Sequence, residues 1–448
     1  MNAYIQRIID QVKKRDASEP EFIQTVEEVL YSIAPMVEKH PEYEKAGLLE
    51  RLVEPERCIS FKVSWVDDNG KVQVNRGYRV QFNGAIGPYK GGIRFHPSVN
   101  WAIMKFLGFE QTFKDALSGL PIGGAKGGSD FDPRGKSDAE VMRFCQSFMT
   151  ELYRHIGPDV DVPAGDLGCG GREIGYMYGQ YRRIKGAFEN GAFTGKGIPF
   201  GGSLARTEAT GYGAVYYAQE VFKHFGEEVK GKKFVISGFG NVAWGVVQKI
   251  NQLGGKVIAI SGPDGYIYDP DGVNKGEKED YMLVMRASGR DKVKDYADKF
   301  GVKFVAGKKP WEVKADVYMP CATQNEINMD EAKKITSSGA KYYIEVANMP
   351  TTNDALKFIQ DSGMLVAPSK AVNAGGVSTS ALEMSQNSMR YSWTFEEVDA
   401  KLHEIMKNIY SNSVAAAEEA GLGYNLVAGA NLAGFKKVAD AMMAQGII

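Results

Sequence analysis

Cysteine and histidine are both scarce, and neither is arranged as in a metal site. The 448 residues contain four cysteines that lie far apart in the chain: Cys58, Cys145, Cys169 and Cys321. Structural zinc sites and disulfide-rich domains use closely spaced cysteines, so we expect free thiols in a reducing compartment, the cytoplasm. The five histidines form no metal-type pair: His40, His96, His155, His224 and His403. The sequence therefore predicts no metal site.

Long apolar runs and an excess of one charge are also missing. No run of 18 apolar residues occurs, so we expect no membrane span. The N-terminus mixes charges instead of following the order of a signal peptide. The uncharged stretch 421–435 is rich in glycine and asparagine and is typical of a packed or functional loop. Lysine plus arginine (54) nearly balance aspartate plus glutamate (55), which gives no overall field for nucleic acid or an anionic membrane.

Glycine, by contrast, is abundant and gathers around particular lysines. Residues 121–133 place Lys126 between two glycine pairs, and Lys90 lies in the glycine-rich stretch 87–92. Glycine at this density weakens regular structure by roughly 0.5–1 kcal/mol per residue, so it usually marks a turn or a backbone that approaches a ligand. If these lysines and Lys114 converge, repulsion and desolvation lower an ammonium pKa towards neutrality, which suits a general base. The alternative is a surface turn with a solvated lysine.

The first 200 residues predict a mixture of helices and strands around these lysines. Apolar spacing predicts a helix over 21–39, and two alternating segments within 59–82, joined by Asn69-Gly70, predict a β-hairpin that leads into the loop of Lys90. Helices also fit 101–117 and 138–155. The first of these two carries Gln111 and Lys114 on one face.

A second cradle of small residues surrounds an acid at 159–171. Asp166 lies within it. Taken alone, Asp166 is best explained as a solvated loop carboxylate. Beside a lysine of lowered pKa it becomes a proton carrier.

After the linker-like stretch 195–203, strands alternate with helices. Residues 238–243 read Gly-x-Gly-x-x-Ala between a strand at 233–237 and a helix to about 253, with another strand at 256–260. This context makes the motif a dinucleotide fingerprint, in which the pyrophosphate meets a helix N-terminus.

More strands continue the sheet at 302–306, 316–319, 341–346 and 364–367, and polar loops are expected at 347–352 and 373–380. Late helices fit about 395–420 and 431–445. We therefore predict an α/β protein with an α/β substrate and assembly domain (1–202), a Rossmann-like doubly wound dinucleotide-binding domain (203–375) and a helical return onto the first domain (376–448).

Four of these stretches resemble, in order and spacing, motifs of the bacterial hexameric glutamate dehydrogenases, within the Glu/Leu/Phe/Val dehydrogenase family: 87–92, 121–132, 162–166 and 373–377. The resemblance covers essentially the whole chain. It implies a homo-hexamer that converts L-glutamate to 2-oxoglutarate and ammonium with a nicotinamide cofactor. The regulatory insertion of animal members has no counterpart between Ser380 and Gly421.

The resemblance also implies roles for individual residues. Lys90 and Ser380 would hold the substrate γ-carboxylate, and Gln111 and Lys114 the α-carboxylate. Lys126 would activate water against the iminium carbon, and Asp166 would shuttle a proton at the amino nitrogen. Further substrate contacts are expected at Ala164 and Val377. Cofactor contacts are expected at Arg206, Thr210, Gly238, Phe239, Gly240, Asn241, Val242, Gly262, Pro263, Asp264, Asn348 and Asn373.

Two other functions and one cofactor question stay open at this point. A dehydrogenase of leucine or phenylalanine would have no use for the charge of Lys90, and a non-catalytic dinucleotide-binding protein would not need Lys126. Asp264 is the only charged residue in the sequence 261–268. A 2′-phosphate in this place would therefore meet a carboxylate and no cation. The sequence therefore favours NAD, with NADP as the alternative if Lys136 or Lys275 reaches the site.

Overall fold

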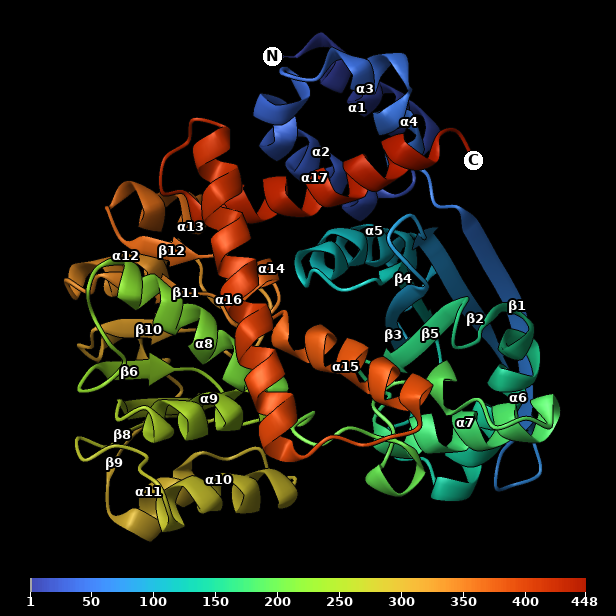
Figure 1. Ribbon diagram of the computed structural model, residues 1–448. Helices are drawn as coiled ribbons and strands as arrows, with labels where there is room; N and C mark the ends of the chain where they lie inside the picture. The colour runs from blue at the N-terminus through green and yellow to red at the C-terminus, as the bar shows by residue number, and fades with distance from the viewer. Residues whose placement is uncertain (1) are drawn as a thin grey trace.

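The computed structural model describes residues 2–448, which fold around two sheets (Figure 1). A five-stranded sheet has the order β1-β2-β4-β3-β5, and a seven-stranded sheet has the order β12-β11-β10-β6-β7-β8-β9. In Figure 1 the two sheets lie on opposite sides of the molecule, with the helices of the C-terminal segment between and above them. The predicted fold class is confirmed.

The first sheet begins with the predicted hairpin. β1 (Arg57–Val66) and β2 (Val72–Asn83) pair antiparallel, and Gly70 adopts the left-handed conformation that the tight turn requires, at φ 76°. β3 (Tyr89–Phe95) lies between β4 (Gly123–Ser129) and β5 (Asp161–Gly165), and both of these pairings are parallel.

The glycine-rich stretch around Lys126 is a central strand of this sheet, so the alternative interpretation as a surface turn is wrong. All seven residues of β4 are buried between β2 and β3. A Cβ at Gly91 in β3 would lie 1.6 Å from the carbonyl oxygen of Ala125, and a Cβ at Gly124 would lie 2.2 Å from Thr112 Oγ1 of the covering helix. Glycine is therefore used here for close packing of strand on strand and helix on sheet. Lys90 likewise lies on β3 instead of a loop.

Helices cover both faces of this sheet and build an N-terminal cluster. Their bounds are α1 (Ala3–Arg15), α2 (Pro20–Val37), α3 (Pro41–Lys45), α4 (Leu48–Leu52), α5 (Trp101–Leu117), α6 (Asp138–Leu152) and α7 (Gly171–Lys185). Short 3-10 turns follow at η1 (Tyr153–His155), η2 (Asn190–Ala192) and η3 (Ile198–Phe200). The helices predicted at 21–39, 101–117 and 138–155 are thus confirmed, the last one ending in η1.

The second sheet is parallel from β12 to β7 and antiparallel beyond it. Its strands are β6 (Lys233–Ile236), β7 (Lys256–Gly262), β8 (Gly265–Tyr268), β9 (Lys303–Ala306), β10 (Val317–Met319), β11 (Tyr342–Ile344) and β12 (Leu365–Ala367). The strand predicted near 302–306 is present, but it reaches the sheet through β8 and runs antiparallel to it. The helices of this part are α8 (Ala209–His224), α9 (Asn241–Gln252), α10 (Glu277–Ala287), α11 (Lys294–Phe300), α12 (Met329–Ser337), α13 (Asn353–Asp361) and α14 (Ser369–Val372), with η4 at Pro310–Glu312.

Three helices complete the chain: α15 (Gly375–Met389), α16 (Phe395–Glu419) and α17 (Leu426–Gln445). The loop predicted at 373–380 is mostly the first turns of α15, and the loop predicted at 421–435 is largely α17. The small residues that suggested loops allow close packing, because a Cβ at Gly429 would lie 2.0 Å from the carbonyl oxygen of Ser413. α17 packs against α2 and α5 above the first sheet (Figure 1). Within residues 2–448 no helix is long and apolar enough to cross a membrane.

Candidate active site

A cleft of about 970 Å³ lies between the two sheets, and its walls come from both. The first wall is built from β3, α5, β4 and the end of β5, and among the predicted site residues it contains Lys90, Gln111, Lys114, Lys126, Ala164 and Asp166. The second wall follows the strand ends of the seven-stranded sheet and the start of α15, and it contains Arg206, Thr210, Asn241, Val242, Asn348, Asn373, Val377 and Ser380. The fold thus places the three lysines in one cleft.

Lys126 and Asp166 form an ion pair in the first wall. The Lys126 Nζ lies 2.9 Å from Asp166 Oδ2, and Arg94 Nε donates to the same oxygen at 2.9 Å. The Lys126 side chain is 9% exposed and that of Asp166 is 23% exposed. The carboxylate is therefore held between two cations at the edge of the cleft.

This arrangement decides the charge of Asp166. Burial by itself raises the pKa of the carboxyl, but the nearby charges of Lys126 and Arg94 and their hydrogen bonds lower it, with a net pKa of about 2. Asp166 is ionised at neutral pH and is a proton acceptor in direct contact with an ammonium. Protons can pass between the two groups without an intervening water.

Lys90 is a buried cation with a neutral partner. The residue is 1% exposed, and its Nζ donates to Thr194 Oγ1 at 2.7 Å. Burial lowers the pKa of Lys90 to about 7, although the charge of Asp115 acts in the opposite direction. A buried ammonium without a directly bonded carboxylate favours binding of an anion from the cleft.

Gln111 and Lys114 lie on the cleft side of α5, beside a buried acid. Gln111 Nε2 donates to Asp115 Oδ1 at 2.6 Å, which fixes the direction of the amide. Burial lowers the pKa of Lys114 to about 8. Burial also raises the pKa of Asp115 to about 8, although Gln111 and the neighbouring lysines oppose the rise. No pattern in the sequence singled out Asp115.

Arg206 and Ser380 meet where the linker and α15 reach the cleft. Arg206 Nε donates to Ser380 Oγ at 3.1 Å, and Val377 lies one turn earlier on the same helix. The preceding residue, Ala205, has φ 58°, a left-handed conformation that is strained for a residue with a Cβ. A Cβ at Gly376 would lie 2.6 Å from Thr210 Oγ1, so glycine lets α8 approach α15 here.

The second wall has the geometry of a dinucleotide site. Gly238 adopts φ 82°, and α9 begins directly after Gly240, where a Cβ would meet no atom within 4 Å. The first N–H groups of a helix have no partner within it and favour an anion. Asn373 Nδ2 donates to Asn348 Oδ1 at 2.8 Å across two neighbouring loops of this wall. These residues fit a dinucleotide with its pyrophosphate at the start of α9.

Comparison with known proteins agrees with this geometry. A sequence model described as Glutamate/Leucine/Phenylalanine/Valine dehydrogenase matches residues 201–446, and one described as the dimerisation domain of Glu/Leu/Phe/Val dehydrogenase matches residues 55–183. The chain belongs to the Glu/Leu/Phe/Val dehydrogenase family.

Individual members of the family are similar along the whole chain. The NAD-specific glutamate dehydrogenase of Clostridium symbiosum is 68% identical over 448 residues, which is 100% of both chains. The NADP-specific glutamate dehydrogenase of Haemophilus influenzae is 54% identical over 446 residues, 99% of each chain. A solved structure of a glutamate dehydrogenase, 68% identical, superposes with a TM-score of 0.98 over 100% of both chains.

The end of β7, predicted to meet the adenine ribose, lies outside the cleft lining described above. Phe239 is buried and packs against Gly262, where a Cβ would lie 2.8 Å from its ring, and Pro263 is exposed. Both carboxylate oxygens of Asp264 accept backbone N–H groups, from Val293 at 2.8 Å and from Lys294 at 3.0 Å. Asp264 therefore also stabilises the start of α11, which the sequence did not indicate, while the ammonium of Lys294 pairs with Asp298.

Besides Asp115, sequence reasoning overlooked Arg94 and Thr194, which bond predicted site residues. Arg94 lies four residues after Lys90 on the same strand, so alternation along β3 puts both side chains on one face, a signal that was present in the sequence. Thr194 precedes Gly195-Lys196-Gly197, a glycine cradle around a lysine that was interpreted as a linker.

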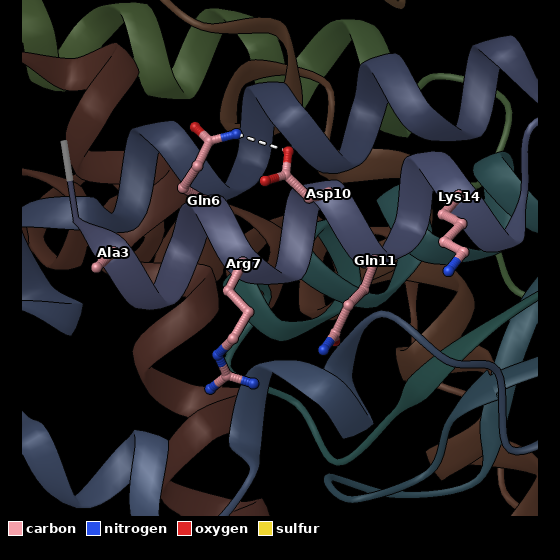
Figure 2. Close-up of a pocket in the computed structure, with 6 residues that line it drawn as sticks. All are labelled: Ala3, Gln6, Arg7, Asp10, Gln11 and Lys14. Atoms are coloured by element: carbon pink, nitrogen blue, oxygen red, sulfur yellow. Dashed lines mark hydrogen bonds between the residues drawn. The ribbon is translucent and has the colours of Figure 1, made fainter.

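A shallower depression runs along α1 and is lined by Ala3 and by polar side chains of that one helix (Figure 2). Its lining residues include Gln6 and Asp10, which are joined by a hydrogen bond of 2.9 Å. The depression on α1 is lined by a single helix, whereas the cleft between the two sheets is lined by residues from several elements. Within residues 2–448 no group of three or more His, Cys, Asp and Glu side chains is arranged to hold a metal.

Proposed function

We propose that this protein catalyses the reversible oxidative deamination of L-glutamate to 2-oxoglutarate and ammonium, with hydride transfer to a nicotinamide cofactor. The observation that carries the proposal is the Lys126–Asp166 ion pair of 2.9 Å, which shares a cleft with the N-terminus of α9. A base and an acid in contact, beside a dinucleotide site, are the groups that amine oxidation needs. Relatives named glutamate dehydrogenase support the choice of reaction.

In this proposal the cations of the first wall bind the two carboxylates of glutamate. Lys90 and Ser380 hold the γ-carboxylate, and Gln111 and Lys114 hold the α-carboxylate. Ala164 and Val377 shape the space between them. Burial of Lys90 supports this assignment, because a desolvated ammonium pairs strongly with a carboxylate.

The proton chemistry belongs to Lys126 and Asp166. The ionised carboxylate of Asp166 accepts a proton from the amino nitrogen and returns it on the reverse path. Lys126 first releases its proton to solvent and then takes one from the water that forms a bond to the iminium carbon. The proton held by Asp166 returns to the nitrogen as the C–N bond breaks and ammonia leaves. Arg94 holds the Asp166 carboxylate in place and, together with Lys126, favours its ionised form before the proton is transferred.

A nicotinamide dinucleotide would supply the hydride acceptor and donor of this reaction. Its holders would be the glycine turn and α9 start (Gly238, Phe239, Gly240, Asn241 and Val242), the β7 end (Gly262, Pro263 and Asp264), and the residues Arg206, Thr210, Asn348 and Asn373. We propose that NAD is preferred over NADP, since the carboxylate of Asp264 repels a 2′-phosphate. Relatives with either preference exist, so the choice rests on this local argument.

We also propose the assembly and organisation that the resemblance implied. The protein would be a cytoplasmic homo-hexamer, a proposal supported in part by the match to a dimerisation domain. Its chain would divide into a substrate domain (1–202), a dinucleotide domain (203–375) and a C-terminal return (376–448). Sedimentation of the purified protein would measure the subunit number.

The activity is measured as glutamate-dependent reduction of each nicotinamide cofactor by the purified full-length chain. We expect turnover with glutamate and at most trace turnover with leucine or phenylalanine, since an unpaired Lys90 ammonium beside an apolar side chain is costly. A preference for leucine or phenylalanine would contradict the substrate. Cofactor binding without any turnover would favour a non-catalytic protein.

A further inference from the structure

A buried ion pair next to the cleft has no part in the chemistry proposed above. Lys196 and Glu383 are both 0% exposed in their side chains, and Lys196 Nζ lies 2.7 Å from Glu383 Oε1. The ammonium also donates to Asn387 Oδ1 at 2.8 Å and to the carbonyl oxygen of Phe193. Its three protons therefore all have acceptors.

Glu383 is equally well satisfied, and its partners all come from one loop. The Gly195 N–H donates to Oε2 at 2.9 Å, and the Lys196 N–H donates to Oε1 at 3.3 Å. These hydrogen bonds and the ion pair hold the loop 193–197 against α15. The same loop carries Thr194, whose hydroxyl bonds Lys90 Nζ and whose N–H donates to the carbonyl of Pro163 at 3.0 Å.

The ion pair lies close to the cations of the proposed γ-carboxylate pocket. Ser380 is one turn before Glu383 on α15, and Arg206 bonds Ser380. Burial lowers the pKa of Lys90 and of Arg206, and the charge of Glu383 opposes that shift in both. Glu383 is therefore within electrostatic reach of both cations.

A buried ion pair is weak evidence for stability, because desolvation of two charges cancels much of their attraction. Apolar residues of similar volume would often serve the fold as well. The location of this pair, behind the residues that would bind a substrate anion, suggests another role.

We propose that Lys196 is a positioning residue that acts through Glu383: it neutralises and holds that carboxylate, so that Lys90 and Arg206 remain available to the side-chain carboxylate of the substrate. Without Lys196, the negative charge of Glu383 would itself interact with Lys90 and Arg206, and it would repel the side-chain carboxylate of the substrate. This inference rests on the proposed function, since it assumes a dicarboxylate substrate.

The experiment compares four full-length variants by two readouts. Lys196→Met removes the cation, Glu383→Gln removes the anion, the double variant removes both, and Lys196→Arg keeps the charge. Calorimetry measures the Kd of glutarate, a dicarboxylate that cannot react. Kinetics measure KM for 2-oxoglutarate, for ammonium and for the cofactor.

We expect Lys196→Met to weaken glutarate binding and raise KM for 2-oxoglutarate by about tenfold or more, with the other two KM values changed by less than about threefold. The double variant should recover to within about threefold of wild type, because no lone carboxylate remains. Lys196→Arg should recover in part. Glu383→Gln alone should change glutarate binding by less than about threefold, since no carboxylate then remains to interact with Lys90 and Arg206.

Lys249→Met is the matched control. Lys249 is also buried, and its Nζ lies 3.0 Å from Asp399 Oδ2, away from the cleft lining. Its loss should lower thermal stability without a change in glutarate binding. If Lys196→Met does not fold, the double variant decides alone: a loss of tenfold or more in glutarate binding there would overturn the inference.

The outcomes distinguish a failure of the role proposed for Lys196 from a failure of the proposed activity. Glutarate binding by Lys196→Met that equals the wild type would overturn the role of Lys196 and leave the proposed activity intact. Wild-type protein that binds glutarate but does not turn over glutamate would contradict the proposed activity, but it would not contradict the proposed carboxylate pocket. Wild-type protein that does not bind glutarate at all would contradict both.

Discussion

The two walls of the cleft use different kinds of group. The first wall gathers buried charges on or beside glycine-rich strands: Lys90, Lys114, Lys126 and Asp166. Apart from Arg206, which bonds Ser380, the predicted site residues of the second wall present amides, hydroxyls and a helix N-terminus: Thr210, Asn241, Asn348 and Asn373. The first wall therefore acts through full charges, and the pKa values of Lys90, Lys114 and Asp166 are shifted there. The second wall acts mainly through fixed dipoles of the backbone and of neutral side chains.

This difference follows from what each wall has to bind. Full charges in a poorly solvated place discriminate strongly between a carboxylate and a neutral group, and they can exchange protons. Backbone N–H groups at a helix start bind a phosphate without any titrating group. Substitutions in the first wall should therefore change chemistry and substrate choice, whereas those at the ribose end of the second should change cofactor choice more gently.

The largest effect is expected at the ion pair of the first wall. Lys126→Ala removes the proposed base and the partner of Asp166, so kcat should fall by at least about a thousandfold, roughly 4 kcal/mol of barrier. Glutarate should still bind, because Lys90 and Lys114 remain. Lys357→Ala, at a side chain 77% exposed on α13, is the control and should leave kcat unchanged. A loss of less than about tenfold would rule out the assigned role.

The charge of Lys90 should decide the substrate. Lys90→Met keeps the length of the side chain but removes the ammonium, so kcat/KM for glutamate should fall by about a hundredfold or more. Activity with norleucine should rise relative to glutamate, since an apolar side chain no longer faces a buried cation. Steady-state kinetics with both amino acids measure this ratio. An unchanged preference for glutamate would contradict the assignment.

A smaller effect is expected at the ribose end of the second wall. Wild-type protein should favour NAD over NADP by about tenfold in kcat/KM, and Asp264→Asn should reduce that ratio, because it removes the like charge near a 2′-phosphate. Asp271→Asn, at an exposed position, is the control. A preference for NADP would overturn the proposal and direct attention to a cation distant in sequence, such as Lys136 or Lys275, as the partner of the 2′-phosphate.

The smallest effect concerns stability at acid pH. The pKa of Asp166 is lowered from 3.8 to about 2, so its ionised form stabilises the fold above pH 3.8, and this contribution is lost as the pH falls towards the folded-state pKa. Between pH 5 and pH 3 the free energy of unfolding should fall by about 1 kcal/mol more for wild type than for Asp166→Asn. Urea unfolding at both pH values measures the difference. Equal falls would show that Lys126 and Arg94 do not hold the carboxylate.

The sequence identified which residues line the cleft better than it identified their local structure. The glycines around Lys126 were interpreted as a backbone that approaches a ligand, with a surface turn as the alternative. They belong to a central strand, where a Cβ at Gly128 would lie 2.4 Å from the carbonyl oxygen of Arg94 in the next strand. The residues at 373–380 were interpreted as a polar loop, but they lie mostly in α15, where glycine lets Thr210 approach. In both places the neighbour that demands a small residue is distant in the chain.

By itself the sequence determined those parts of the structure that depend on short local patterns of residues. Alternation with Asn69-Gly70 specified the hairpin, and Gly-x-Gly-x-x-Ala between a strand and a helix specified the start of α9. These signals are local, since the periods of strands and helices are set by backbone geometry. Composition and spacing also singled out Lys90, Lys114 and Lys126, which the fold places in one cleft.

Only the tertiary structure decided the partners and the charges. The pairing of β3 with β4 and β5 brings Arg94 and Lys126 to Asp166, and the fastening of 193–197 to α15 brings Thr194 to Lys90. Partners and burial set the pKa of Asp166 near 2 and that of Lys90 near 7. The physical reason is that desolvation and Coulomb interactions depend on distances in space, which the order of residues does not contain.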